Sequence, residues 1–134
     1  MIYYLHEQKE KMLSNPCNKK LDAVLQKNFP ENDKWGVNVL FDNVKNADTI
    51  EICRLSDYKV IGRVAGSSGR ESETWTHYAT IGWSSEHGKW EVYTQFNGKD
   101  KNELWVFKYY SRFADACRCV STGAFRKLTP ILKY

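Results

Sequence analysis

The chain has 134 residues, of which 42% are hydrophobic, 14% aromatic and 27% charged. This length fits one domain, and the apolar content excludes a disordered segment, so we expect residues 1–134 to form a single globular domain. The net charge of +4 is too small to identify a nucleic-acid-binding protein by itself.

The first residues, MIYYLHEQKEKML, lack the basic segment followed by an apolar one that marks a secretion signal. No apolar run approaches the length of a membrane-spanning helix. We therefore expect a cytoplasmic protein that does not enter a membrane. The four cysteines of such a protein are expected to be free thiols. Cys117 and Cys119 would face different sides of a helix, so the sequence predicts no metal site and no cofactor.

Residues 1–30 are predicted to be a helical segment. A short helix is expected over residues 2–13, and a second begins at Asn15-Pro16, because Asn is a favoured N-cap and Pro is tolerated at the first helical position. Cys17, Leu21 and Leu25 belong to the apolar stripe of this second helix. The helix is expected to end before the proline at position 30.

Residues 36–110 are predicted to form an antiparallel sheet of about five to six strands. Residues 36–43 alternate between apolar and polar side chains. Residues 49–55 and 58–65 are predicted to pair as a hairpin that turns at Ser56-Asp57. The loop GSSGR, residues 66–70, leads from there to the centre of the fold. It lacks the spacing of a phosphate-binding loop.

The centre of the predicted fold is a three-stranded meander over residues 74–83, 89–96 and 104–110, joined by two short polar loops. Strict alternation places Tyr78 and Tyr93 on the polar faces of their strands, where we expect them to be exposed. Alternation also places Trp105, Phe107 and Tyr109 on one face of the third strand. We expect Trp105 and Phe107 to lie in the core beneath the helices.

Residues 111–123 are predicted to form a helix that is capped by Ser111 and stopped by Gly123. Its buried stripe comprises Phe113, Ala116, Cys117 and Val120. Residues 124–134 are predicted to be an extended tail. The predicted fold class is therefore α+β, with an N-terminal helical segment, an antiparallel sheet with a meander core and a C-terminal helix packed on the sheet.

The sequence contains no recognisable catalytic constellation and no motif that resembles a known family closely enough to transfer a function. His77 and His87 are the only candidates for catalytic residues. A metal-independent ribonuclease or nucleotide-processing enzyme could use the two imidazoles as base and acid. Nothing in their spacing forces them together, so this enzyme is one of two alternatives to a binding protein.

The aromatic and basic residues favour a protein that works by binding. The predicted binding residues are Tyr78, Tyr93, Arg112, Arg118, Arg126 and Lys127. Our first hypothesis is a non-catalytic protein that docks on a larger protein partner, as an inhibitor or adaptor of the kind that phages and mobile elements encode. The second alternative is a nucleic-acid-binding protein that uses the same residues. An exposed aromatic face could also be closed by formation of a homodimer.

Overall fold

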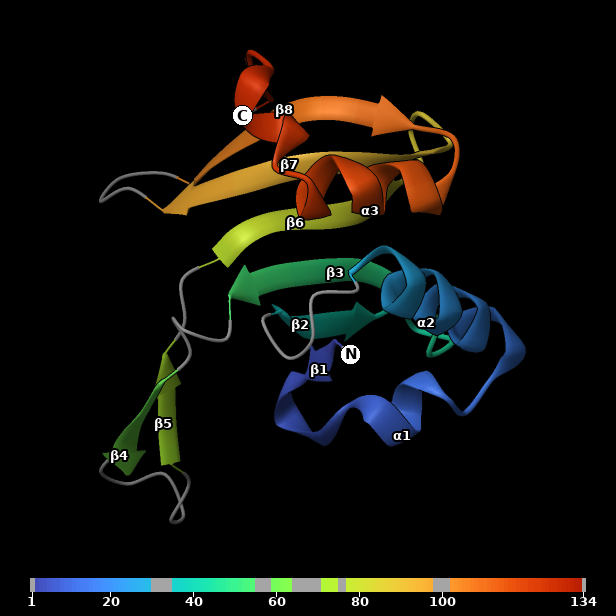
Figure 1. Ribbon diagram of the computed structural model, residues 1–134, viewed down its shortest axis with the longest axis vertical. Coiled ribbons are helices and arrows are strands. Elements are labelled where there is room, and N and C mark those ends of the chain that lie inside the picture. Colours follow the sequence, from blue (N-terminus) through green and yellow to red (C-terminus); the bar gives the residue numbers. More distant parts are fainter. Residues whose placement is uncertain are drawn as a thin grey trace.

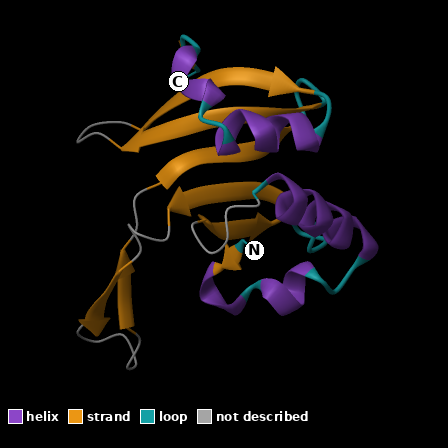
Figure 2. Cartoon of the chain, viewed as in Figure 1, coloured by secondary structure: helices purple, strands orange, loops and turns teal. Residues whose placement is uncertain are grey.

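A computed structural model of the chain describes residues 2–29, 35–54, 59–63, 71–74, 77–97 and 102–133. Within these residues the fold is α+β, as the sequence predicts. Figure 1 shows α2 and α3 lying on the same side of a twisted sheet, with the C-terminal helix packed on it. Figure 2 shows the same separation of helices and strands by colour.

The helical elements are η1 (Leu5–Glu7), α1 (Lys9–Met12), α2 (Pro16–Asn28), α3 (Phe113–Ser121) and η3 (Ala124–Lys127). The main sheet contains β1 (Tyr3–Tyr4), β2 (Trp35–Phe41), β3 (Ala47–Arg54), β6 (His77–Ser84), β7 (Lys89–Asn97), β8 (Asn102–Tyr110) and β9 (Ile131–Leu132). A second sheet contains β4 (Lys59–Arg63) and β5 (Glu71–Thr74).

The described strands of the main sheet follow the order β1-β2-β3-β6-β7-β8-β9. Only β1 and β2 are parallel among these pairs, and the remaining neighbours are antiparallel. The predicted meander of β6, β7 and β8 is confirmed. Its strands are consecutive in the chain, so short loops suffice to connect them.

The predicted hairpin between residues 49–55 and 58–65 is wrong. β3 pairs with β2 on one side and with β6 on the other, so neither of its edges remains for β4. β4 pairs instead with β5, and Figure 1 shows this second sheet projecting away from the main one. The proposed turn at Ser56-Asp57 and the loop at residues 66–70 lie outside the described residues. So do residues 75–76, which separate β5 from β6 where the sequence predicts one strand.

The N-terminal segment also differs from the predicted helix over residues 2–13. Tyr3 and Tyr4 form β1, and the Gln8 side chain then continues the pairing with β2. Its amide nitrogen donates to the Val39 carbonyl oxygen at 2.8 Å, and its amide oxygen accepts from the Val39 N–H at 2.8 Å. The primary amide thus takes the place of a backbone peptide group and satisfies both backbone groups of Val39 at the outer edge of β2.

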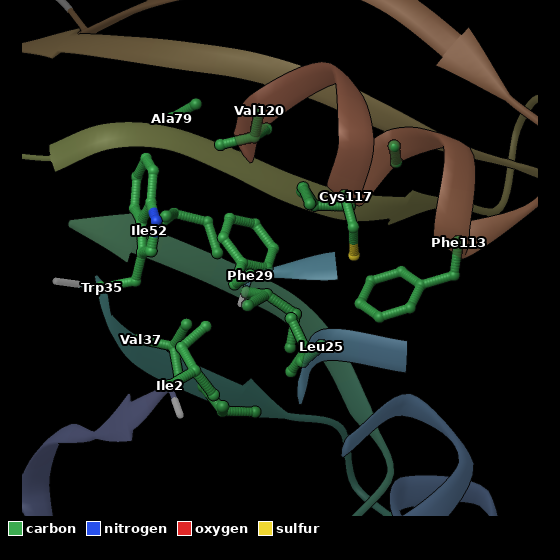
Figure 3. Packing of buried hydrophobic residues seen from close by; sticks show 14 of the residues in the cluster. Ile2, Leu25, Phe29, Trp35, Val37, Ile52, Ala79, Phe113, Cys117 and Val120 are labelled. Carbon is green, nitrogen blue, oxygen red and sulfur yellow. The ribbon is translucent and has the colours of Figure 1, made fainter. Parts of the chain in front are cut away.

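The hydrophobic core lies between the sheet and the two longer helices, α2 and α3. Figure 3 shows Leu25 and Phe29 packed with Trp35 and Ile52, below Cys117 and Val120 of α3. α2 begins as predicted, because the Asn15 side chain accepts a hydrogen bond from the Asn18 N–H at 2.7 Å. The core therefore fixes both helices on one face of the sheet, and none of the described helices longer than one turn packs on the other face.

α3 buries the predicted stripe of Phe113, Ala116, Cys117 and Val120. The helix is capped by Arg112 and not by Ser111, because Arg112 is the residue with extended backbone angles before the first helical turn. Gly123 follows the helix with a φ of +75°, in the left-handed region that favours glycine, so the predicted stop is confirmed.

The segment after α3 is not simply extended. Residues Ala124–Lys127 form the 3-10 helix η3, which buries Phe125. The chain then returns to the sheet, where Ile131 and Leu132 pair with Val106 and Trp105 of β8. Sequence reasoning missed η3 because its stability comes from the burial of Phe125 rather than from a local pattern.

Candidate functional site

Arg54, the last residue of β3, stacks on a buried tryptophan. Trp35 is its cross-strand neighbour on β2, and 2% of Trp35 is exposed. The Arg54 guanidinium carbon lies 3.8 Å from the centroid of the Trp35 ring. Stacking of this kind immobilises a guanidinium group while its N–H groups stay available at the edge of the plane.

Tyr78 lies beside this stack because β6 is irregular at that point. Ile52 pairs with Ala79 and Cys53 pairs with His77, so Tyr78 is the extra residue of a β-bulge. Its ring contacts the Trp35 ring, with centroids 5.0 Å apart, and the Arg54 guanidinium carbon lies 5.4 Å from its centroid. The sequence analysis expected an exposed Tyr78. The ring is half-buried and packs against the hydrophobic core, because the bulge shifts the alternation.

A second arginine reaches Tyr78 from the C-terminal segment. Phe125 is buried and its ring centroid lies 5.1 Å from that of Tyr78. Arg126, the next residue of η3, is exposed, and its guanidinium carbon lies 4.7 Å from the Tyr78 centroid. We call these five residues the arginine–aromatic cluster: Trp35, Arg54, Tyr78, Phe125 and Arg126.

The arginine–aromatic cluster places two positive charges beside one tyrosine ring. The guanidinium carbon of Arg54 lies 5.4 Å from the Tyr78 centroid, and that of Arg126 lies 4.7 Å from it. Within the described part of the chain, no carboxylate forms an ion pair with Arg54 or Arg126. External anionic groups would offset the repulsion between these two charges, and each guanidinium could donate hydrogen bonds to one of them. The cluster therefore has the chemistry of a binding site for an anionic group.

The other predicted basic residues stand in different environments. The Arg118 guanidinium forms an ion pair with Asp115 and donates to the Asn28 side chain at 3.3 Å, so it links α3 to the end of α2. Arg112 is exposed at the start of α3, and Lys127 is exposed next to Arg126. Of the basic residues predicted to bind a partner, Arg126 is thus the one that contacts a tyrosine of the predicted set, Tyr78. Lys127 is its neighbour in the chain.

Tyr93 lies on the opposite face of the sheet from the core. It pairs with Thr80, and its ring covers Gly82, where an added Cβ would come within 3.0 Å of the ring. Desolvation, together with the negative charges of Glu91, Glu51 and Asp48, raises the pKa of Tyr93 to about 12. This face is therefore acidic around Tyr93, and the tyrosine is half-buried rather than exposed as predicted.

β8 is also divided between the two faces, which corrects the alternation predicted for its aromatic residues. Phe107 packs against Phe125 on the core side, with ring centroids 5.2 Å apart, whereas Tyr109 pairs with Glu91 on the open face. A register shift opposite Val92 and Tyr93 separates them. Trp105 is half-buried, and its indole N–H donates to the Glu103 carboxylate at 3.1 Å.

The two candidate catalytic histidines are not brought together by any described contact. His87 is exposed in the turn between β6 and β7. Its Nδ1 lies 3.0 Å from the Ser84 hydroxyl oxygen, which also accepts the His87 N–H at 3.3 Å. This pattern stabilises the turn, and the serine is 5% exposed, which leaves little access for a substrate. The backbone of His77 pairs with Cys53, while its side chain lies outside the described part of the structure.

The four cysteines are free thiols, and three of them are buried. Burial raises the pKa of the Cys117 thiol well above its ordinary value, which opposes formation of a reactive thiolate. Among the residues that the structure describes, no group of His, Cys, Asp and Glu side chains could hold a metal ion. No described helix has the length and apolar character needed to cross a bilayer.

Comparisons with protein-family models, with curated proteins and with solved structures gave no match for this chain. The functional interpretation therefore depends on the geometry of the described residues. Sequence reasoning missed Trp35, Arg54 and Phe125 as members of the site. The sequence offered one clue to the contact between Trp35 and Arg54: the tryptophan begins one apolar strand and the arginine ends the next. Their pairing depends on a register that the sequence alone does not reveal.

Proposed function

We propose that this chain is a non-catalytic binding protein that docks on a larger protein partner through the arginine–aromatic cluster. The observation that carries the proposal is that two guanidinium groups, Arg54 and Arg126, are held on aromatic rings without a described carboxylate partner. Tryptophan, tyrosine and arginine are the residues that contribute most to binding energy in protein interfaces. A partner of this kind would make the chain an inhibitor or an adaptor.

The geometry gives less support to the two alternatives. A nucleic-acid-binding surface was expected to combine Tyr78 with Tyr93, but the two rings lie on different faces of the sheet. The carboxylates around Tyr93 would also repel phosphates. The enzyme hypothesis depends on His77 and His87, and the Ser84–His87 contact is explained by the structure of the turn.

The cytoplasm remains the compartment that we propose. Its support is chemical, because four free thiols suit a reducing environment. The folded chain would meet such a partner with the cluster already assembled, because strands β2, β3 and β6 and the 3-10 helix η3 hold its residues in place. Such preorganisation reduces the entropic cost of binding.

Site-specific photo-crosslinking in the native cells tests this proposal. A photoreactive amino acid replaces Lys127, which is exposed beside the cluster, or Val44, which is 70% exposed at the opposite end of β2 and β3. We expect one discrete protein adduct from position 127 and none from position 44. Adducts that disappear on nuclease treatment would contradict the proposal, as would the same pattern of adducts from both positions.

A further inference from the structure

We propose that the arginine–aromatic cluster recognises carboxylate side chains, and that the segment it binds on the partner is rich in Asp and Glu. This inference rests on the proposed function, because it specifies the chemistry of the partner at the same site. It is based on the contacts of the two guanidinium groups with aromatic rings, and not on the net charge of the chain.

The guanidinium groups of Arg54 and Arg126 are held by different aromatic rings. Each guanidinium lies nearest to a different ring: Arg54 is 3.8 Å from the Trp35 centroid, and Arg126 is 4.7 Å from the Tyr78 centroid. A stacked guanidinium presents its fork of N–H donors sideways, where a carboxylate can accept two parallel hydrogen bonds. The cluster thus offers two separate forks and not a single point of positive charge.

The rings that support the two guanidinium groups are held rigidly. Trp35 is 2% exposed and Phe125 is 4% exposed, so the rings at both ends of the cluster are fixed in the core. Tyr78 is fixed between them by edge-on contacts with centroid distances of 5.0 and 5.1 Å. The forks are therefore presented by a packed support, whereas most surface arginines must lose side-chain entropy when they bind.

The spacing of the two guanidinium groups bears on which anionic ligand the cluster would bind. Two forks that stand on different rings match two carboxylates from neighbouring acidic side chains. A single phosphate group is better matched by donors that converge on one point, as in a backbone cradle at the start of a helix. The described helix that adjoins the cluster, η3, has four residues and is too short to supply such a site. Carboxylates are therefore the ligand class that the geometry favours.

The experiment measures binding of short fluorescein-labelled peptides to the full chain by fluorescence anisotropy. One peptide alternates Glu with Gly, a second alternates Gln with Gly, and a third carries phosphoserines in the Gln and Gly background at matched net charge. We expect the Glu peptide to bind most tightly and the Gln peptide not to bind. Tighter binding of the phosphoserine peptide than of the Glu peptide would overturn the choice of carboxylate.

Three variants identify the site. Arg126→Gln is expected to weaken binding of the Glu peptide by about tenfold or more, since hydrogen bonds to charged groups are strong ones. Arg126→Lys keeps the charge but loses the fork, so we expect it to lose most of the same affinity. Arg112→Gln removes an equal charge from an exposed position outside the cluster and is expected to leave binding nearly unchanged. Equal effects of Arg112→Gln and Arg126→Gln, or full affinity in Arg126→Lys, would overturn the inference.

Arg54→Gln completes the set, with its melting temperature measured alongside because Arg54 packs on the core tryptophan. The exposed Arg126 keeps the test decisive if Arg54→Gln unfolds. The outcomes separate the two proposals. A protein adduct at position 127 without binding of the Glu peptide would reject the carboxylate inference alone. Binding of the Glu peptide without any protein adduct would reject the docking function.

Discussion

Asn18 shows how much one polar side chain contributes to this fold. It is fully buried on α2, and both polar atoms of its side chain bond to the backbone of the segment between β2 and β3. Its amide oxygen accepts from the Ala47 N–H at 2.8 Å, and its amide nitrogen donates to the Lys45 carbonyl at 2.9 Å. The residue therefore fastens the start of α2 to the sheet.

Replacement of Asn18 by Ala should destabilise the protein. The buried Ala47 N–H would lose this partner, and the exposed Lys45 carbonyl would keep only the longer hydrogen bond from the Asn15 side chain, so we expect the free energy of unfolding to fall by about 1–3 kcal/mol. Urea denaturation of the variant measures this change. Lys19→Ala, on the exposed side of the same helix, is the matched control and should change stability by less than about 0.5 kcal/mol. A similarly small change for Asn18→Ala would contradict the role given to its side chain.

Tyr93 supplies a prediction about alkaline pH. Its pKa is raised to about 12 from the ordinary value of 10.0, first by desolvation and then by the nearby carboxylates. The folded state therefore retains a proton that the unfolded state loses between these two values. The stability that Tyr93 contributes is fully present below about pH 10 and is lost as the pH rises toward about 12.

This prediction is checked by titrating the phenolate absorbance of the native protein and of Tyr93→Phe. The difference between the two curves should show a tyrosine that titrates near 12. Glu51→Gln should lower that pKa, because it removes one of the negative charges. A difference curve centred on the ordinary value would show that Tyr93 does not lie in the desolvated acidic environment described.

At the scale of elements, the short strand β9 is the edge strand of the main sheet next to β8. It has two residues, and it is flanked by Pro130 and Lys133. The Lys133 N–H donates to the Leu104 carbonyl at 2.8 Å, and its side chain forms an ion pair with Glu91 at 3.2 Å. Short edge strands with proline and lysine are devices by which proteins avoid edge-to-edge association.

A chain that ends at Pro130 should therefore self-associate more than the full chain does, because the outer edge of β8 would be left open. Light scattering across a concentration series should show a mean mass that rises more steeply for the shortened chain. Lys133→Ala is the control, since it keeps the backbone pairing of β9 and removes the side-chain ion pair with Glu91. Equal masses for the shortened and full chains would show that β9 does not protect this edge.

The elements that sequence reasoning predicted well are those whose signals are local. The cap at Asn15, the stop at Gly123 and the meander of β6, β7 and β8 follow from residues close together in the chain. Most of the errors concern long-range pairing, although the local prediction that Ser111 caps α3 was also wrong. β3 joins β6 rather than β4, and the bulge at Tyr78 exists only because of that pairing. No pattern within one strand reveals a bulge that is imposed by its neighbour.

The candidate site was predicted in part for the same reason. Tyr78 and Arg126 were predicted as binding residues from their types and positions, and the structure places them in contact with each other. Arg54 was missed, and Tyr93 belongs to another surface. Residue type shows which side chains are suited to binding, whereas the strand register and η3 decide which of them meet.

At the scale of the whole molecule, the two faces of the sheet differ in cover and in charge. Both longer helices lie on one face, and the arginine–aromatic cluster packs against the core on that side. The open face carries Glu51 and Glu91, with the Asn38 side chain donating to Glu51 at 2.7 Å. An acidic partner would therefore be attracted to one side of the molecule and repelled from the other, which favours a single docking orientation.

The most direct test of the docking account is a comparison of what co-purifies with three forms of the chain from its native cells after nuclease treatment. The forms are the unaltered chain, the double variant Arg54→Gln with Arg126→Gln, and the control Arg112→Gln. We predict a discrete protein that accompanies the unaltered chain and the control and is lost with the folded double variant. Equal recovery of that protein with all three forms would contradict docking through the arginine–aromatic cluster.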